Sequence, residues 1–245
     1  MIIPHNNWNI PDDINSIGND VISKIEKEGG IYFPVKDKIF RFMEADFNKL
    51  RYIIVGMDPY ASTYDNNGIK MPIATGRSFE VSNMHSWTQK VPQASIRNIL
   101  CAIYYAKTGT REPLAKIRNH IEDGSFKILP PNEWYAEMER QGVLFLNASL
   151  TVHEGMPGSH AKYWNDYMTK LSGYIVRTKN PVWLLWGNDA KGRFKDIVPE
   201  DKAIYAHHPR LQDFIKDNPF SYLEGIDITG YRERNCNGLQ RMLNV

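Results

Sequence analysis

The chain has 245 residues, of which 42% are hydrophobic, enough to bury the core of one sizeable α/β domain. Its formal net charge is only +2, so overall charge does not indicate nucleic-acid binding, and any DNA contact must come from local basic patches. The two cysteines, Cys101 and Cys236, are far apart and form no C-x-x-C pair, which argues against a disulfide framework, an iron–sulfur cluster or a cysteine-rich zinc site. We expect two reduced, buried thiols, no bound metal and no cofactor.

Short apolar runs alternate with amphipathic stretches along the chain. In chain order, the pattern predicts a helix over 14–28, a strand over 52–55, helices over 96–107 and 133–141, a strand over 143–146, a helix over 163–178 and strands over 182–186 and 203–206. This alternation predicts a single domain over residues 1–245. The expected fold is a three-layer α/β/α sandwich with a central, mostly parallel four-stranded sheet.

Two segments interrupt the alternation. Residues 62–75 are polar and contain Asn66-Asn67-Gly68, which indicates a surface loop, and residues 108–131 are charged and end in Pro130-Pro131, which indicates an insertion or extended connection. The N-terminus has no secretory signal pattern, and no run of about 18 apolar residues could span a membrane. We therefore expect a cytoplasmic protein, with a nuclear or virion location left open.

Polar side chains follow three of the predicted strands. Asp58 comes after the first strand, Asn147 ends the second, and His207-His208 follow the fourth. Ligands of open parallel sheets bind outside the carboxyl ends of the strands, so a carboxylate, an amide and an imidazole are expected at one edge. A carboxylate can orient water or stabilise a cation, an amide can bind a base edge, and an imidazole can stabilise an anion. This combination suits cleavage of an N-glycosidic bond.

Each of these residues alone has a structural interpretation. Asp58 before Pro59 could start a turn, Asn147 could cap a strand, and the two histidines could serve packing or a weak metal site. Their joint position at successive strand ends favours the functional interpretation.

Six segments, which occur in the same order as in a known family, carry a specific resemblance. They are Val55-Gly56-Met57-Asp58-Pro59-Tyr60, then residues 74–81 (ATGRSFEV), 91–99 (VPQASIRNI), 142–152 (GVLFLNASLTV), 183–191 (WLLWGNDAK) and 208–211 (HPRL). Together they resemble the motifs of family 1 uracil-DNA glycosylases. The resemblance covers roughly residues 50 to 212 and implies base flipping, hydrolysis of the bond to the sugar and DNA as the partner of a monomeric enzyme.

The resemblance also implies roles for individual residues. Asp58 would orient the attacking water and stabilise the cationic sugar, and His208, rather than His207, would stabilise charge on the base oxygen. Tyr60 would exclude a thymine methyl group, Phe79 would stack on the flipped base, and Asn147 would hydrogen-bond its edge, which fits the physics of base flipping. Met57 also lies in the substrate-binding motif. Pro92, Ser95, Arg210 and the wedge candidate Leu211 would contact DNA, and we expect a basic strip formed by Arg97, Lys191, Arg193 and Arg210.

The sequence departs from the family pattern at several positions. Met57 replaces a glutamine and Ala61 a histidine, 19 positions separate Tyr60 from Phe79, Arg210 stands where a serine is expected, and Gln212 stands where the wedge leucine is expected. The longer segment and Ala61 suggest an alternative, a glycosylase for a C5-modified pyrimidine. A catalytically weak DNA-binding scaffold is a second alternative. Nucleotide hydrolysis is disfavoured, because residues 187–193 lack the lysine and hydroxyl side chain of a phosphate-binding loop.

Overall fold

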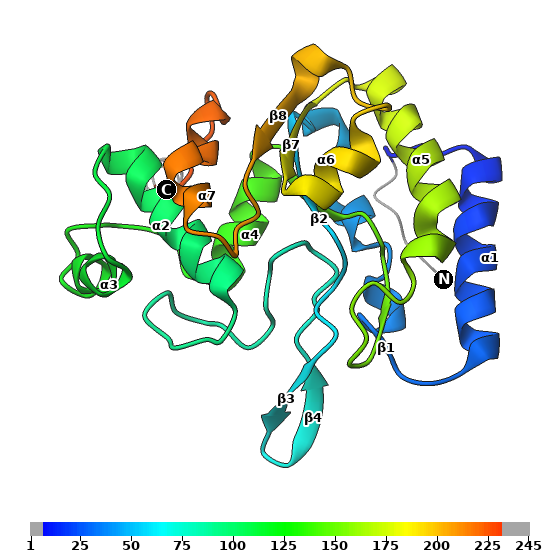
Figure 1. Ribbon diagram of the computed structural model, residues 1–245, viewed down its shortest axis with the longest axis horizontal. Coiled ribbons are helices and arrows are strands. Elements are labelled where there is room, and N and C mark those ends of the chain that lie inside the picture. Colours follow the sequence, from blue (N-terminus) through cyan, green and yellow to red (C-terminus); the bar gives the residue numbers. More distant parts are fainter. Residues whose placement is uncertain (1–6, 232–245) are drawn as a thin grey trace, which may run out of the picture. The chain divides into compact units, whose positions relative to one another are not determined.

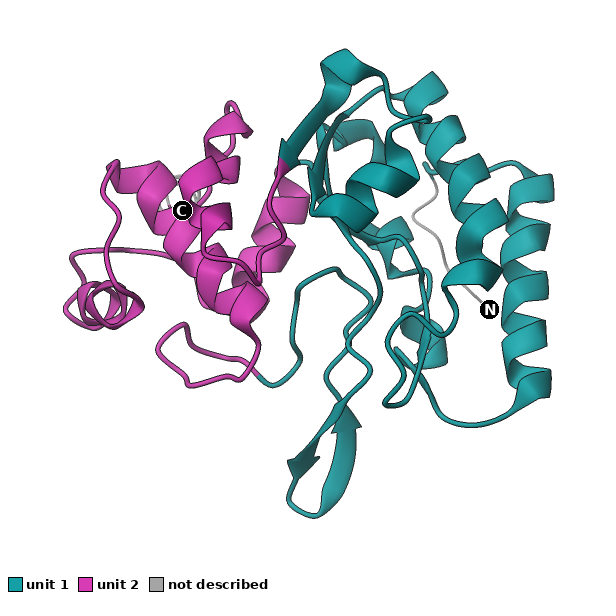
Figure 2. Ribbon diagram, in the orientation of Figure 1, with its two compact units in different colours: residues 1–83, 142–205 teal, residues 84–141, 206–245 magenta. Residues whose placement is uncertain are grey.

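The computed structural model describes residues 7–231 and divides into two compact units. Unit 1 comprises residues 1–83 and 142–205, and unit 2 comprises residues 84–141 and 206–245 (Figure 2). The prediction of one domain over the whole chain stays a prediction. Cys101 is a free, buried cysteine, and burial raises the pKa of its thiol to about 11, so it stays protonated at neutral pH. Cys236 lies outside the described residues.

A four-stranded sheet forms the centre of unit 1. Its strand order is β5 (Val143–Asn147), β2 (Tyr52–Gly56), β7 (Val182–Trp186) and β8 (Ala203–Ala206). The strand β2 pairs in parallel with β5 on one side and with β7 on the other, and Gly56 lies directly opposite Asn147. All four strands were predicted within one residue of their bounds, because long apolar runs are typical of buried parallel strands. The α/β fold with a central four-stranded sheet is therefore confirmed.

Three helices of unit 1 share a hydrophobic core with one face of this sheet. They are α1 (Asp12–Glu28), α5 (Ala161–Thr178) and α6 (Asn188–Phe194) (Figure 1). Alternate strand residues form the sheet's side of this core, namely Ile53, Val55, Leu144, Leu146, Trp183 and Leu185. The intervening residues, such as Ile54, Phe145 and Leu184, are also buried, so both faces of the sheet are covered.

Shorter elements complete unit 1. A two-stranded sheet joins β1 (Tyr32–Phe33) to β6 (Val152–His153), and the short 3-10 helices are η1 (Lys36–Lys38), η2 (Arg41–Glu44), η3 (Phe47–Lys49) and η4 (Glu200–Lys202).

The segment predicted as a surface loop is instead a β-hairpin that extends away from the rest of unit 1 (Figure 1). Its strands are β3 (Thr63–Asn66) and β4 (Ile69–Pro72), which pair in antiparallel register. The connecting residues Asn67 and Gly68 both have positive φ, 55° and 84°. A two-residue type I′ turn requires that backbone, and an Asn-Gly pair adopts it readily.

Unit 2 is helical. It contains α2 (Ala94–Thr108), α3 (Leu114–Glu122), α4 (Pro131–Arg140), α7 (Asp213–Asp217) and the 3-10 helix η5 (Pro219–Tyr222). Residues 108–131 were predicted to be an insertion or an extended connection. They do not form an extended connection, because the segment contains α3 and packs into unit 2. Ile117 is fully buried, Phe126 and Leu129 are buried, and the indole of Trp87 donates a 2.7 Å hydrogen bond to the carbonyl oxygen of Leu129.

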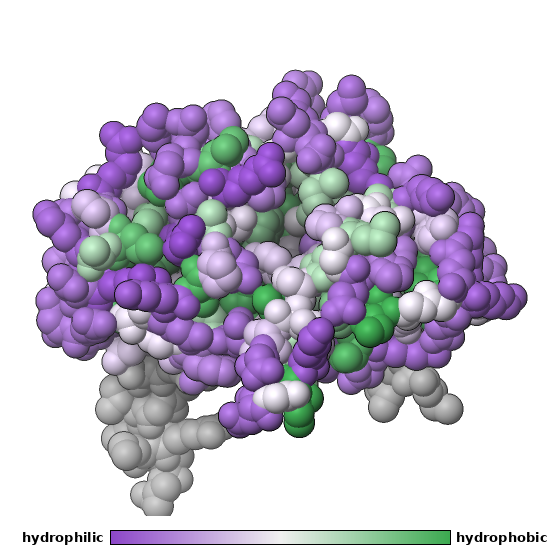
Figure 3. Space-filling view, turned by 60° about the horizontal axis from the view of Figure 1, so that its bottom comes forward, coloured by the Kyte–Doolittle hydropathy of each residue, from purple (hydrophilic) through white to green (hydrophobic). Residues whose placement is uncertain are grey.

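The face of the surface in Figure 3 is mainly hydrophilic, with small separate apolar patches. Among residues 7–231, no helix combines the length and apolar character needed to cross a membrane.

Candidate active site

Asp58 lies two residues beyond the carboxyl end of β2 and is partly buried. Its Oδ2 accepts a 2.6 Å hydrogen bond from the main-chain N–H of Gly158, in the loop before α5. Within residues 7–231, Oδ1 has no hydrogen-bond partner, so it is available to a water molecule or a ligand. Burial raises the pKa of the Asp58 carboxyl, and the hydrogen bond from Gly158 partly offsets this. The result is a carboxylate with one fixed and one available oxygen.

Asn147 ends β5 directly opposite Gly56 of β2, and the residue is only 2% exposed. A Cβ atom at position 56 would lie 2.7 Å from Oδ1 of Asn147 and 2.6 Å from Cβ of Ser78, so the amide occupies space that only glycine leaves open. In the described part of the chain, no hydrogen bond holds this amide. Because no described residue pairs with this amide, it can bind the edge of a polar ligand.

Phe79 is buried and has a φ of +63°, a left-handed backbone conformation that bulky residues rarely adopt. Such a conformation costs about 1–3 kcal/mol and persists only where neighbouring contacts impose it. Its ring lies 5.4 Å from that of Trp186, at the end of β7, with an angle of 42° between the ring planes. Phe79 therefore lies beside the carboxyl end of the sheet, in unit 1 with Asp58 and Asn147.

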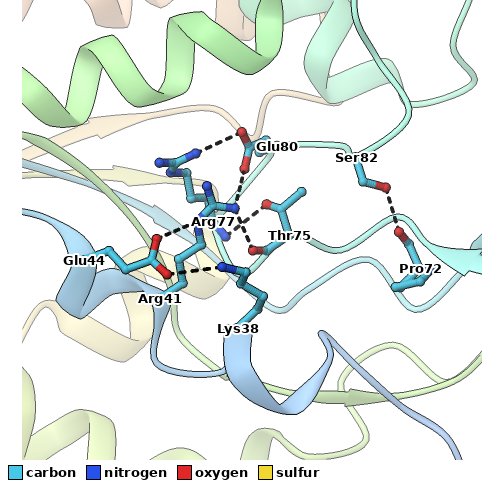
Figure 4. A network of polar contacts seen from close by, with 8 residues as sticks. All are labelled: Lys38, Arg41, Glu44, Pro72, Thr75, Arg77, Glu80 and Ser82. Carbon is cyan, nitrogen blue, oxygen red and sulfur yellow. Dashed lines mark hydrogen bonds and ion pairs between the residues drawn. The ribbon is translucent and has the colours of Figure 1, made fainter. Parts of the chain in front are cut away.

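The segment that carries Phe79 is fixed on both sides. On one side, Ser78 Oγ donates a 3.2 Å hydrogen bond to the Ile54 carbonyl oxygen, and the Ser78 N–H donates one of 3.4 Å to that of Phe145. On the other side, buried Glu80 pairs with two arginines, Arg77 at 3.1 Å and Arg41 at 3.4 Å (Figure 4).

Tyr60 and Met57 also come from the loop after β2, and both are partly buried. Burial raises the pKa of the Tyr60 phenol, so the ring is neutral across the physiological range. The main-chain oxygen of Met57 accepts a 2.9 Å hydrogen bond from the N–H of Ser149, which joins this loop to the residues after β5.

Ala61 is buried. Its side chain packs in a small hydrophobic cluster with Phe33, Ala74 and Val152. The Ala61 carbonyl oxygen also accepts a 2.7 Å hydrogen bond from the N–H of Gly155. The replacement of the family histidine by alanine is thus absorbed by packing, and it gives no support to an enlarged pocket.

The two histidines in unit 2 differ in their contacts. The ring nitrogen Nδ1 of His207 lies 2.8 Å from Asp217 Oδ2, which also accepts from the His207 main-chain N–H at 2.6 Å. By contrast, Nδ1 of His208 accepts a 3.1 Å hydrogen bond from the N–H of Arg210, so in the neutral ring the proton lies on Nε2. His207 holds the loop in place through Asp217, whereas the contact of His208 Nδ1 is with the main chain of Arg210.

The predicted DNA-contacting residues of unit 2 form one neighbourhood. Asn98 of α2 is buried, and its amide donates hydrogen bonds to the carbonyl oxygens of Pro209 at 2.7 Å and Leu211 at 3.4 Å. The loop that carries His208, Arg210 and Leu211 is thereby attached to α2, whose second residue is Ser95. Pro92 and Arg210 are exposed, and the side chain of Leu211 is 45% exposed. Sequence reasoning missed Asn98, although it lies within the motif that supplied Pro92 and Ser95.

The four cations of the predicted basic strip are not equivalent. Arg210 and Lys191 are exposed, whereas Arg97 donates a 3.3 Å hydrogen bond to the Val91 carbonyl oxygen and so supports the loop at Pro92. Arg193 is partly buried, and burial lowers the pKa of its guanidinium. Arg210 and Lys191 are the better candidates for phosphate contacts.

Each unit thus carries one group of the predicted residues. Unit 1 holds Met57, Asp58, Tyr60, Phe79 and Asn147 around the ends of β2, β5 and β7, and unit 2 holds Pro92, Ser95, His208, Arg210 and Leu211 around α2 and the loop after β8. Among residues 7–231, no three His, Cys, Asp or Glu side chains are grouped as metal ligands.

Comparisons with known proteins identify the family of the chain. No protein-family profile matches the chain. The uracil-DNA glycosylase of Campylobacter curvus is 33% identical over 188 residues, which cover 75% of this chain and 68% of that protein. The chain belongs to the uracil-DNA glycosylase family. The uracil-DNA glycosylase of Mesomycoplasma hyopneumoniae is 27% identical over 84% of this chain and 78% of its own length.

Solved structures of this family share the fold. The UNG crystal structure from Nitratifractor salsuginis matches with a TM-score of 0.65 and 20% identity, over 87% of this chain and 90% of that one. The mimivirus uracil-DNA glycosylase structure matches with a TM-score of 0.56 and 23% identity, over 80% of this chain. The match spans 62% of the mimivirus chain, less than two thirds of its length.

Proposed function

We propose that this protein is a monofunctional DNA glycosylase that flips uracil out of DNA and hydrolyses its N-glycosidic bond, which starts base-excision repair. The observation that carries the proposal is the Asn147 amide, buried opposite Gly56 and without a hydrogen-bond partner in the described part of the chain. A pyrimidine edge would satisfy it, and the Phe79 ring in the same unit offers a surface on which a flipped base can stack.

Asp58 supplies the charge that the reaction needs. As the bond to the base breaks, the sugar becomes cationic, and a carboxylate stabilises this charge while Oδ1 accepts a proton of the attacking water. The hydrogen bond from Gly158 fixes Oδ2, so the carboxylate is oriented before the substrate arrives. No side-chain nucleophile is assigned, which favours direct hydrolysis.

His208 has the complementary role in the proposal. The base leaves as an anion, and the Nε2–H of a neutral imidazole can donate a hydrogen bond to the base oxygen on which charge develops. Pro92, Ser95 and Arg210 contact the DNA backbone, and Leu211 is the candidate that fills the space left by the flipped nucleotide. Tyr60 excludes the methyl group of thymine.

The proposal is tested with an oligonucleotide that contains a single uracil. We expect free uracil and an abasic site, detected by mass spectrometry, and no covalent protein–DNA product on borohydride treatment. A trapped product would show a lysine nucleophile and contradict the hydrolytic mechanism. Absence of uracil release by a protein of native fold would contradict the assigned function.

We also infer that the enzyme acts as a monomer inside the cell, where its DNA substrate is found. Light scattering at micromolar concentration should give a mass close to the 28.3 kDa of one chain. A stable dimer would contradict this part of the proposal.

A further inference from the structure

Arg41, Arg77 and Glu80 form a buried ion cluster next to Phe79. The exposed fractions of the Arg77 and Glu80 side chains are both 7%, and that of Arg41 is 19%. Buried charges are costly unless they are paired in good geometry, and a buried ion pair is weak evidence for stability. In some proteins such pairs fix one conformation of the chain.

The three residues come from two parts of the chain. Arg77 and Glu80 flank Phe79 within one short segment, whereas Arg41 lies in η2, 39 residues before Glu80. Arg41 also donates a 3.0 Å hydrogen bond to the Thr75 carbonyl oxygen and pairs with Glu44. Arg41 thus links η2 to both ends of the segment 75–80 (Figure 4).

The base of the segment is held separately. A β-bridge joins Ala74 to Val81, and Ser82 Oγ donates a 2.6 Å hydrogen bond to the Pro72 carbonyl oxygen. Ser78 is bound to the sheet through Ile54 and Phe145. With Ser78 held by the sheet and Glu80 held by the arginines, Phe79 is the residue that must absorb the backbone turn, which accounts for its positive φ.

We propose that Glu80, together with Arg41 and Arg77, is a positioning group that holds Phe79 in the conformation in which its ring stacks on the target base. This inference rests on the proposed function, because it gives Phe79 a flipped base as its partner.

Enzyme kinetics can distinguish a role of Glu80 in positioning Phe79 from a role in the stability of the fold alone. Glu80→Gln keeps the shape and removes the charge that both arginines face. Stacking acts on the flipped base before and during bond cleavage, so KM should rise about tenfold while kcat changes little. Arg41→Gln, which leaves Glu80 its partner Arg77, should raise KM less. A simple loss of folded protein would instead lower the apparent kcat at constant KM.

Glu137→Gln is the matched control. Glu137 is 6% exposed and pairs with Arg140 at 2.6 Å, but it lies on α4 in unit 2. We expect Glu137→Gln to lower the thermal unfolding temperature by about as much as Glu80→Gln does, and to leave KM unchanged. Equal effects of Glu80→Gln and Glu137→Gln on KM would overturn the proposal, as would a change in kcat alone.

A crystal structure of Glu80→Gln gives a readout that needs no activity. We expect Phe79 to leave the left-handed region and its ring to move relative to Trp186, and an unchanged φ near +63° would overturn the proposal. If the wild-type protein releases no uracil, the proposed function fails, and this structure still decides whether Glu80 sets the conformation of Phe79.

Discussion

The main-chain N–H of Gly158 donates a 2.6 Å hydrogen bond to Oδ2 of Asp58, 100 residues earlier in the chain. It fixes one carboxylate oxygen of the candidate catalytic residue, and Oδ1 has no partner within residues 7–231. This arrangement gives the first two predictions.

Asp58→Asn should slow base release about 10²–10³-fold, because the amide keeps the shape and loses the charge that faces the sugar cation. DNA binding should persist in a gel-shift assay. Asp196→Asn, at an exposed position of unit 1, is the control and should leave the single-turnover rate unchanged. Equal rates for the wild type and Asp58→Asn would remove Asp58 from the mechanism.

The raised pKa of Asp58 predicts a pH dependence. Only the ionised carboxylate stabilises the sugar cation, so activity should rise with pH along a limb centred above 3.8, the ordinary value for an aspartic acid. Because the folded-state pKa is raised, folding favours the protonated group, and stability is lost as pH rises through that pKa. Asp58→Asn should therefore unfold at a temperature equal to or higher than that of the wild type at pH 7. A clearly lower unfolding temperature would contradict this assignment.

Gly56→Ala should damage the site without an alteration of any catalytic group. The new Cβ would lie 2.7 Å from Oδ1 of Asn147 and must displace the amide. We expect at least a tenfold loss in kcat/KM and a stability loss of about 1–3 kcal/mol from overpacking. The matched control is Gly192→Ala, on α6, where the added Cβ meets no atom within 4 Å. Full activity of Gly56→Ala would show that the position of Asn147 is unimportant.

His208→Ala should slow base release in single-turnover assays, because it removes the Nε2–H donor. His207→Ala should act mainly on stability, since His207 anchors its loop through Asp217. If His207→Ala slows base release more than His208→Ala, the roles assigned to the two histidines are reversed.

Arg210→Glu should weaken binding to all DNA sequences alike and reduce the salt dependence of binding by about one counterion, because we propose that this exposed arginine contacts a phosphate group. Arg193→Gln should have less effect, since its guanidinium is partly buried. For both variants, fluorescence anisotropy at several salt concentrations measures the DNA affinity and its salt dependence. A loss confined to one target base would mean that Arg210 binds the base itself.

The elements predicted best were those with a local signal. The runs at 52–55 and 182–186 are apolar throughout, and such runs are typical of buried parallel strands. The hairpin at 63–72 was missed although Asn67-Gly68 is a strong turn signal, because neither flanking strand contains a buried residue. The helix α3 was missed because only Ile117 among its residues is buried.

The candidate site residues were predicted from their positions at strand ends and in motifs, whereas the contacts that hold them in the structure were not predicted. Gly158 contacts Asp58 across 100 residues, Asn98 contacts Pro209 across 111, and Arg41 contacts Glu80 across 39. No local pattern encodes such pairs, since each depends on how the chain folds back on itself.

The most direct test of the central claim compares bases in otherwise identical duplexes that carry uracil, thymine, cytosine or a C5-substituted uracil or cytosine at one position. Base release is measured by abasic-site cleavage, with Asp58→Asn as the blank. We predict rapid release of uracil and none of thymine, cytosine or the bulky C5-substituted bases, because we propose that Tyr60 excludes a group on C5 and because Ala61 is packed in a hydrophobic cluster. Release of a C5-substituted base without release of uracil would contradict the account.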